Sequence, residues 1–254
     1  MNSTPSPYRS LSRLYTESSL GEDVTAELGP AAAHKMRAVL RAKTGDVVTL
    51  FNGRDGEWWA ELTALGKASA RALCLERIRP QQSEPGPWLA FAPLKKDRLD
   101  MVVEKAVELG AECLLPVITR RTENRRLKME RLAQQVVDAA EQCERLTLPR
   151  LLAPVLLERL AGAWPADRAL LVAAERREAA PLAEAIRATA GPLGFLIGPE
   201  GGFEDGELDA VLKLPKSSAV NLGALILRAE TAAMTVLAVA NALPPHRNAS
   251  DEKA

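Results

Sequence analysis

The sequence predicts an α/β protein in which a small β-rich domain precedes a larger domain built on a parallel sheet. Residues 1–80 contain short strand-like runs around a hairpin signal. Residues 79–87 form a Pro- and Gly-rich break that is typical of a domain boundary. From residue 88 onward, apolar strand-like runs alternate with amphipathic helical patterns, as in a parallel sheet covered by helices. We therefore expect two domains, at 1–80 and 88–246.

The expected first domain consists of short strands joined by tight turns. Val47–Phe51 is strand-like, the turn residues Asn52–Gly56 follow it, and Trp58–Leu62 begins the returning strand. Residues 68–78 suggest a third strand, and residues 34–41 have a short helical pattern. Because several short strands must hide their edges, we expect a small β-barrel.

The second domain shows clear helical periodicity after its first strand. From Asp97 the apolar residues recur at spacings of three and four, and this pattern ends at Gly110. The same reasoning applies to the rest of the domain. We expect strands near residues 88–93, 113–118, 168–173, 194–197 and 219–223, and helices near 97–109, 127–145 and 181–189, from 204–208 onward, and over 231–243.

Composition limits the possible functions. The 33 basic and 33 acidic residues give a net charge of zero, so any RNA contact has to come from local patches. The 3 cysteines form no C-x-x-C pair, which argues against a zinc site or a disulfide framework. The first residues lack the apolar run of a signal peptide, and the most apolar stretch, 231–245, is too short to cross a bilayer. We expect a cytoplasmic protein without a metal or a membrane partner.

Two glycine-rich segments follow predicted strands, and the pattern of the domain is organised around them. Gly198, Gly201 and Gly202 follow one strand, and Gly223 follows the next. Glycine leaves the backbone uncovered, so a ligand can approach it closely at the carboxyl ends of a parallel sheet. Neither segment has the spacing of a phosphate-binding loop, and both are apolar. They suit a flat neutral ring; the alternative is a pair of tight turns that bind nothing.

These segments carry a resemblance to a known family. Ile197–Phe203, Leu222–Gly223 and Ile226–Ala232 together resemble the SPOUT class of methyltransferases, and more narrowly the RsmE family, which methylates N3 of a uridine in 16S ribosomal RNA. The resemblance implies S-adenosyl-L-methionine as cofactor, a trefoil knot and a homodimer. It places the cofactor at Gly198, Gly201, Gly202, Leu222, Gly223, Ile226 and Leu227.

The resemblance extends more weakly over residues 1–80, which are similar to the PUA-like domain of the same family. The matching segments are Arg13–Tyr15, His34, Val39–Arg41, Gly45–Asp46 and Leu50–Gly53. Local basic clusters, at 95–98 and 120–131, supply charge for RNA phosphates or are simply solvated surface. Together these matches imply RNA contacts at Arg13, Arg41, Lys95, Lys96, Arg98, Arg121 and Arg145.

Two positions depart from the family pattern. Cys143 replaces the serine of an E-Q-S-x-R segment on a predicted helix, which puts a hydroxyl role there in doubt, while Gln142 and Arg145 remain available for RNA or a dimer partner. Glu204 stands where serine is common after G-P-E-G-G-F, and Glu204 or Asp205 can still cap the following helix.

The chemistry implied by the resemblance assigns roles to two charged residues. Methylation at N3 requires loss of a proton and stabilisation of the negative charge that spreads to O2 and O4. Arg228 suits that stabilising role because a guanidinium stays charged and binds an oxygen in a fixed geometry. Glu230 can orient Arg228, act as a base, or anchor the helix, and we favour the structural role.

Other readings remain open. A non-catalytic RNA-binding factor in ribosome assembly has no need of an apolar adenosine pocket, and an enzyme for transfer RNA or a ribose 2′-hydroxyl would keep the pocket but change the target. The last helix, 231–243, is apolar almost all round, so a second surface besides the sheet has to cover it. A deep monomer core would do so, and the homodimer implied by the resemblance is the alternative that we favour.

Overall fold

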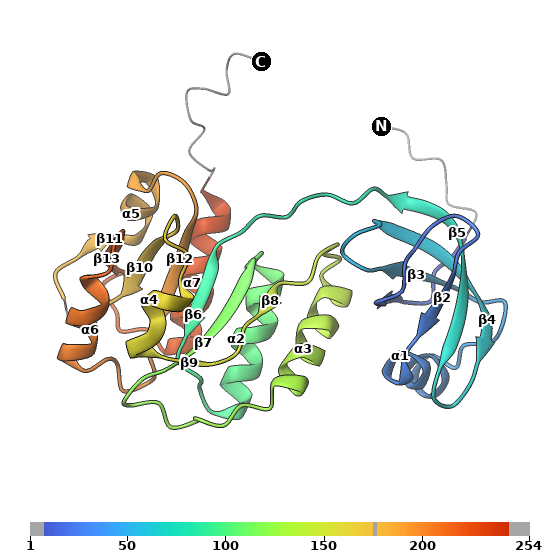
Figure 1. Ribbon diagram of the computed structural model, residues 1–254, viewed down its shortest axis with the longest axis horizontal. Helices are drawn as coiled ribbons and strands as arrows, with labels where there is room; N and C mark the ends of the chain where they lie inside the picture. The colour runs from blue at the N-terminus through green and yellow to red at the C-terminus, as the bar shows by residue number, and fades with distance from the viewer. Residues whose placement is uncertain (1–7, 175–176, 244–254) are drawn as a thin grey trace, which may run out of the picture. The chain divides into compact units, whose positions relative to one another are not determined.

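The computed structural model describes residues 8–174 and 177–243. The chain forms two compact units (Figure 1). The first comprises Met1–Glu84 and Ala140–Leu148, and the second comprises Pro85–Ala139 and Pro149–Ala254. Residues 140–148, at the end of the third α-helix, therefore belong to the first unit. The domain ranges 1–80 and 88–246 stay a prediction.

The first unit is a mixed five-stranded sheet with the order β1-β3-β4-β5-β2. Only β1 and β3 pair in parallel, and the other neighbours are antiparallel. The expected hairpin joins β3 to β4, and its turn is fixed by Asn52, whose Oδ1 accepts hydrogen bonds from the backbone of Arg54 and Asp55. The elements are β1 Arg13–Tyr15, β2 Thr25–Leu28, α1 Pro30–His34, the π-helical η1 Lys35–Val39, β3 Val47–Phe51, β4 Glu57–Leu65 and β5 Ala70–Arg79.

Side chains link the two outer strands of this sheet. Thr16 and Ser18, just after β1, both donate hydroxyl hydrogen bonds to the carbonyl of Glu27 in β2, and the Glu27 N–H donates to Ser18 Oγ at 3.0 Å. These bonds satisfy edge groups that a backbone ladder leaves open. Leu14, Met36 and Leu50 are fully buried inside the unit.

The second unit is a parallel sheet with the order β11-β13-β10-β12-β6-β7-β8, and β9 also pairs with β7 (Figure 1). The α/β fold expected from the sequence is confirmed. Its strands are β6 Trp88–Phe91, β7 Cys113–Ile118, β8 Arg150–Leu151, β9 Val155–Leu156, β10 Ala169–Ala173, β11 Ala180–Pro181, β12 Leu193–Ile197 and β13 Ser217–Asn221. Its helices are α2 Lys96–Glu108, α3 Met129–Gln142, η2 Leu157–Arg159, α4 Leu160–Ala163, α5 Leu182–Ala188, α6 Asp205–Leu212 and α7 Ala229–Ala242.

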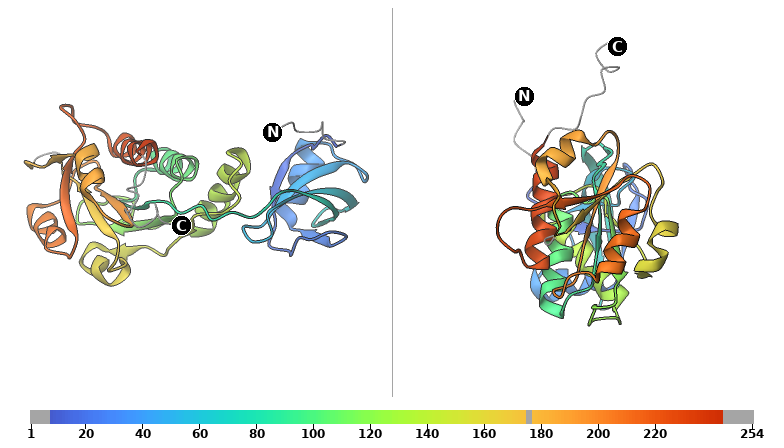
Figure 2. Two further views of the ribbon diagram at one scale, coloured as in Figure 1. Left: turned by 90° about the horizontal axis from the view of Figure 1, so that it is seen from above. Right: turned by 90° about the vertical axis from the view of Figure 1, so that its left-hand side faces the viewer.

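Helices cover both faces of this sheet, as Figure 2 shows. Helices α2, α5 and α7 pack together on one face. Helix α6 and the η2–α4 segment lie on the other, where Leu208 and Val211 of α6 join Leu157 in an apolar cluster with the strands. Strands buried on both faces explain why the sequence shows continuous apolar runs here instead of alternation.

The chain crosses the sheet near its end. It runs from α6 on one face through β13, which lies between β10 and β11, to α7 on the opposite face. Strand β11 directly follows β10 in the sequence, so β13 is inserted between two consecutive strands. The link between β10 and β11 includes residues 175–176, which lie outside the described residues, and the trefoil knot stays a prediction.

Two features are absent from the described residues. None of their helices is long and apolar enough to cross a membrane. No group of three or more His, Cys, Asp or Glu side chains among them is arranged to hold a metal ion.

Candidate functional site

A cavity of about 650 Å³ opens where β10, β12 and β13 end at the same edge of the sheet. Its walls are the glycine-rich loop 198–203 after β12 and the loop 222–228 between β13 and α7. The structure therefore brings together two loops that the sequence singled out separately. Every residue expected to bind the cofactor lines this cavity: Gly198, Gly201, Gly202, Leu222, Gly223, Ile226 and Leu227.

Backbone conformation explains two of the glycines. Gly202 has φ +69° and donates a hydrogen bond from its N–H to the carbonyl of Pro199 at 2.8 Å, closing a tight turn. Gly223 has φ +123°, and its N–H donates to Asn221 Oδ1 at 2.7 Å. Both conformations are costly for residues with a Cβ. Gly198 is needed for another reason, because a Cβ there would lie 2.9 Å from the ring of Phe203.

Apolar side chains on the second loop remain uncovered. Leu225 and Ile226 are 80% and 73% exposed, although both belong to the loop that lines the cavity. Large exposed apolar side chains beside a concave surface are typical of a ligand site. Sequence reasoning missed Phe203, Leu225 and the small residue Ala173, which also line the cavity. The signal for Ala173 was its place at the end of β10, between the two glycine-bearing strands.

The cavity also has charged walls. Arg228 precedes the first residue of α7, is exposed, and makes no side-chain hydrogen bond or ion pair within the described part of the chain. Arg98 also lines the cavity, with Nη1 3.3 Å from Glu200 Oε1 and Nε 3.6 Å from Glu230 Oε1. Glu230 is only 7% exposed, and its Oε2 is buried without a hydrogen-bond partner.

The geometry bears on the three roles considered for Glu230, of which we favoured the structural one. Its carboxylate pairs with Arg98 of α2 and not with Arg228. Glu230 is also absent from the described residues that line the cavity, whereas Arg98 is among them. Glu230 is buried in the first turn of α7, and its ion pair with Arg98 joins that turn to α2. The structure thus favours the anchoring role for Glu230.

Family models match both parts of the chain. A model described as an RNA methyltransferase domain matches residues 83–241, and one described as an RNA methyltransferase PUA domain matches residues 32–73. The chain is 32% identical over 238 residues to ribosomal RNA small subunit methyltransferase E of Rickettsia conorii, covering 92% of this chain and 96% of that protein. The chain belongs to the RsmE family.

Other members are similar over most of their length. The Synechocystis protein of the same name is 35% identical over 231 residues, covering 87% of this chain and 74% of that protein. The crystal structure of the Neisseria gonorrhoeae enzyme bound to S-adenosyl methionine matches with a TM-score of 0.80 at 31% identity, covering 89% of this chain and 95% of that one. A Legionella pneumophila methyltransferase in complex with the same cofactor matches with a TM-score of 0.79 at 28% identity, covering 92% and 98%.

In this RsmE-family chain, the basic segment 119–131 is held by its own arginines. Arg125 donates hydrogen bonds to the carbonyls of Thr119, Arg120 and Thr122, so it fixes the shape of the segment. Arg131 forms an ion pair with Asp100 at 2.7 Å. The exposed charges that remain for a partner include Arg126 and Lys128, together with Lys96 at the start of α2.

The other basic residues expected to contact RNA in this unit have protein partners. Lys95 Nζ lies 3.2 Å from Glu123 Oε2, but both side chains are more than 70% exposed, so the pair is weak. Arg121 is exposed and donates from Nη1 to the carbonyl oxygen of Gly201 at 2.7 Å. Arg121 thus connects the basic segment to the glycine-rich loop of the cavity.

In the first unit, two of the three residues expected to contact RNA are structural. Arg13 lies over the Phe51 ring and pairs with Glu57, and its other two guanidinium nitrogens donate to the carbonyls of Ala140 and Arg145. Because each of its three nitrogens already has a partner, the expected RNA contact does not fit this geometry.

The RNA contact expected for Arg145 does not fit the structure for a similar reason. Its side chain is buried, with Nε 3.6 Å from Glu84 Oε2. The preceding Glu141 accepts a hydrogen bond from the Tyr15 N–H at 3.0 Å and pairs with Lys35. The segment 141–145 therefore ties the first unit together. Of the two residues expected to be available to RNA or a dimer partner, Gln142 is exposed and Arg145 is buried. Arg41 is exposed and adopts φ +53°.

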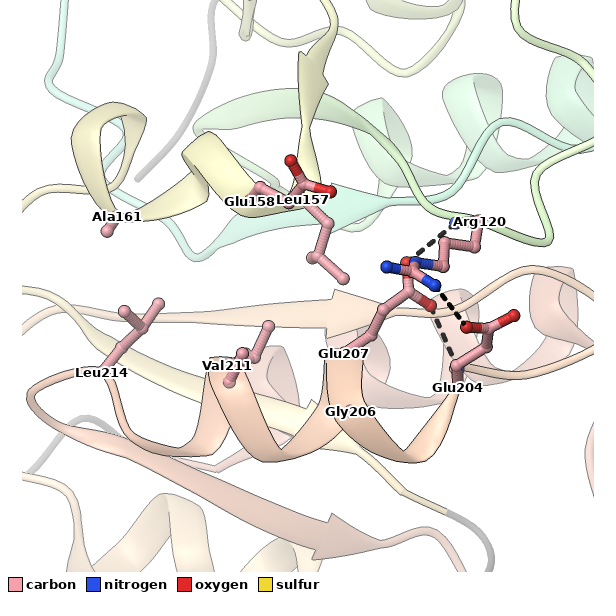
Figure 3. Close-up of a pocket in the computed structure, with 10 residues that line it drawn as sticks. Arg120, Leu157, Glu158, Ala161, Glu204, Gly206, Glu207, Val211 and Leu214 are labelled. Atoms are coloured by element: carbon pink, nitrogen blue, oxygen red, sulfur yellow. Dashed lines mark hydrogen bonds and ion pairs between the residues drawn. The ribbon is translucent and has the colours of Figure 1, made fainter.

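A second, smaller cavity of about 320 Å³ lies between α6 and the η2–α4 segment (Figure 3). Leu157, Val211 and Leu214 form its apolar lining. At one end, Glu204 and Glu207 form a capping box at the start of α6, which confirms the expected capping role of Glu204. Glu207 Oε1 also accepts a hydrogen bond from the backbone N–H of Arg120 at 2.8 Å, so α6 is joined to the basic segment.

Proposed function

We propose that this protein transfers a methyl group from S-adenosyl-L-methionine to N3 of a uridine in 16S ribosomal RNA. The observation that carries the proposal is the meeting of two glycine-rich loops around one cavity of about 650 Å³. The solved relatives from Neisseria gonorrhoeae and Legionella pneumophila hold this cofactor. The curated relatives are named as methyltransferases of small-subunit ribosomal RNA.

The residues of the cavity fit such a cofactor. Its volume lies within the roughly 300–1,000 Å³ of ligand pockets that bind small organic molecules. The backbone at Gly201, Gly202 and Gly223 can approach a flat ring, with Ile226 and Leu227 available to cover it. When bound, the cofactor supplies a methyl group already activated on a sulfonium. We assign binding to Gly198, Gly201, Gly202, Leu222, Gly223, Ile226 and Leu227.

Arg228 is the residue we assign to the chemistry. In the reaction, N3 of the uracil loses its proton and gains the methyl group, and negative charge develops on O2 and O4. A guanidinium held beside one of these oxygens lowers the energy of that charge. Arg228 lines the cavity with its charge uncommitted within the described chain, which is the condition such a role requires.

For RNA binding we assign the exposed basic residues of both units. Lys95 and Lys96 follow strand β6, Arg121 touches the cofactor loop, and Arg41 lies in the PUA-like unit. Because phosphate contacts are electrostatic and carry no sequence information, these residues would position the RNA and leave selection of the uridine to the cavity. We propose that the PUA-like domain binds RNA and the SPOUT-like domain carries out catalysis in the cytoplasm, where ribosomes are assembled.

We also propose that the protein is a homodimer. Helix α7 buries Ala232, Ala233, Val236 and Leu237 within the chain. Ala238 on the same helix remains exposed, and Met234 and Val239 are only half-buried. An apolar helix that leaves part of its surface uncovered is suited to a second copy. Analytical ultracentrifugation at micromolar concentration should give twice the mass of the chain, and a monomer would remove this proposal.

The function is tested by methyl transfer with purified protein. We would offer labelled S-adenosyl-L-methionine with 16S ribosomal RNA, with small ribosomal subunits and with transfer RNA, each from a strain lacking the gene, and identify the product nucleoside by mass spectrometry. We expect 3-methyluridine in the ribosomal samples alone. A labelled transfer RNA or a 2′-O-methylated nucleoside would assign another target. Failure to bind the cofactor in calorimetry would favour a non-catalytic assembly factor.

A further inference from the structure

The glycine-rich loop of the cavity is contacted by arginines from both basic clusters. Arg121 donates from Nη1 to the Gly201 carbonyl oxygen at 2.7 Å, and Arg98 Nη1 lies 3.3 Å from Glu200 Oε1. Arg121 also packs along the loop, since a Cβ at Gly201 would lie 3.4 Å from its Cδ. Residues with the charge to bind RNA phosphates therefore support the loop that we assign to the cofactor.

The end of the same loop is joined to the basic segment through its backbone. Glu207 of α6 accepts hydrogen bonds from the N–H of Arg120 at 2.8 Å and from the N–H of Glu204 at 3.0 Å (Figure 3). Arg120 Nη1 also lies 3.3 Å from Glu204 Oε2. These bonds bring the main chain of the basic segment close to the main chain at the end of the loop. A shift of the basic segment would therefore also move the end of the loop.

Arg121 is the member of this network best placed to bind two groups at once. A guanidinium has five N–H donors in a planar arrangement. The contact with Gly201 uses one of them, and the side chain is exposed, so the others can bind a phosphate. A phosphate bound there would restrict the Arg121 side chain, and the Gly201 contact would then cost less conformational entropy.

We propose that Arg121 is a positioning residue that couples RNA binding to cofactor binding, holding the loop at Gly201 while it binds an RNA phosphate. This inference rests on the proposed function, because it takes the cavity as the cofactor site and the basic segment as an RNA surface. The coupling is positive. Bound RNA strengthens cofactor binding, and the cofactor strengthens RNA binding by the same factor, as thermodynamic linkage requires.

The coupling is measured on the full chain by titrating S-adenosyl-L-homocysteine in the absence and presence of saturating 16S ribosomal RNA. In the wild-type protein we expect RNA to tighten binding roughly fivefold, at the low end of allosteric coupling because Arg121 is exposed. Arg121→Ala should bind the probe with the same affinity in both conditions. Arg121→Lys keeps the charge but lacks the planar fork, so it should retain most RNA affinity and lose most of the coupling.

Arg126→Ala is the matched control. Arg126 belongs to the same basic segment and is exposed, but it forms no hydrogen bond or ion pair with residues 198–204 in the described structure. This variant should weaken RNA binding and leave the coupling factor unchanged once RNA is saturating. Circular dichroism and thermal unfolding establish that all variants are folded.

Three outcomes would overturn the inference: equal probe affinity with and without RNA in the wild-type protein, full coupling in Arg121→Ala, or equal loss of coupling in Arg126→Ala. Methyl transfer by the same wild-type preparation separates this inference from the proposed function. Transfer to 16S ribosomal RNA without coupling would refute the coupling alone. Coupling without transfer would support it and count against the proposed reaction.

Discussion

Arg98 and Glu230 form an ion pair between helices α2 and α7, with Nε 3.6 Å from Oε1. Glu230 lies in the first turn of α7, where a carboxylate also interacts favourably with the helix dipole. Its second oxygen is buried and has no hydrogen-bond partner, so the ion pair with Arg98 is what offsets the burial of this charge. Because Arg98 also reaches Glu200, the pair connects the start of α7 to the glycine-rich loop.

Removal of Arg98 should therefore destabilise the fold. Arg98→Ala leaves Glu230 buried without its cation, and we expect a loss of about 1–3 kcal/mol in the free energy of unfolding, less than for a fully buried pair because Arg98 is 37% exposed. Urea denaturation measures this loss. Glu230→Gln in the Arg98→Ala background should recover part of it.

Arg131 provides the control for this comparison. It is also 37% exposed and pairs with Asp100 of α2, but Asp100 is 29% exposed, whereas the Glu230 side chain is 10% exposed. Arg131→Ala should cost no more than about 1 kcal/mol, as for a surface ion pair. Equal losses in the two variants would show that burial of Glu230 has no energetic consequence.

Gly223 offers a test of the cofactor site. Gly223→Val places a branched side chain in open space at the cavity wall, where φ is +123°. We expect a loss of at least tenfold in affinity for S-adenosyl-L-methionine by calorimetry, because the side chain blocks the approach of the ligand to the backbone. Backbone strain of about 1–3 kcal/mol is expected as well.

Gly191 separates strain from occlusion. It has φ +85° and open space around it, but it precedes β12 and does not line the cavity among the described residues. Gly191→Val should therefore show similar destabilisation by thermal unfolding and normal cofactor affinity. If both variants lose affinity equally, the pocket assignment at Gly223 fails.

The glycine loops were predictable because their chemistry is local. Gly202 and Gly223 follow apolar runs, and the need for positive φ or an open backbone is visible in the residue type itself. In a parallel sheet the strand ends share one edge, so the meeting of the two loops also follows from the strand pattern. The family resemblance added the identity of the ligand, which residue chemistry alone left as a flat ring.

Which arginines are buried in ion pairs and which stay exposed was not predictable, because this depends on partners distant in the sequence. Arg13 is paired with Glu57 and with carbonyls beyond residue 139, and Arg145 with Glu84. The charge of an arginine is visible in a sequence, whereas its burial is decided by tertiary packing. The same holds for Glu230, whose partner on α2 is more than a hundred residues away.

Glu57 should make the first unit sensitive to acid. Burial alone would raise the pKa of Glu57, but hydrogen bonds from Arg79 and Arg13 outweigh it and hold the pKa below its ordinary value. A lowered pKa in the folded state contributes stability above the unfolded value of about 4.3, and this contribution is lost as pH falls through the folded pKa.

Glu57→Gln should therefore destabilise the protein at pH 7, and this destabilisation should become smaller as the pH falls. We expect a loss of about 2–3 kcal/mol in the free energy of unfolding at pH 7, which is less than for a fully buried pair because Arg79 is 39% exposed. Chemical denaturation at a series of pH values measures the difference between the two proteins. Glu61→Gln, on the exposed side of the same strand, is the control, and a difference constant from pH 7 to pH 3 would contradict the assignment.

Arg228→Ala tests whether catalysis and cofactor binding depend on different residues of the cavity. Arg228 has no ion pair or side-chain hydrogen bond in the described structure, so its loss should leave the free energy of unfolding nearly unchanged. Cofactor affinity should also remain within about twofold, because we assign ground-state binding to the glycine loops and the apolar residues. The rate of methyl transfer to 16S ribosomal RNA should fall by roughly 10²–10³, as when a donor to a developing oxyanion is removed.

Single-turnover kinetics with saturating cofactor and RNA separates this effect from weaker RNA binding. Loss of a residue that stabilises only the transition state lowers the rate at saturation, whereas loss of one that merely holds RNA raises the RNA concentration needed and leaves that rate intact. Arg228→Lys is the informative second variant, since it keeps the charge but not the planar donor geometry, and it should recover part of the rate. Near-normal turnover at saturation in Arg228→Ala would contradict the catalytic role. Arg228 would then bind RNA or have a structural role at the start of α7.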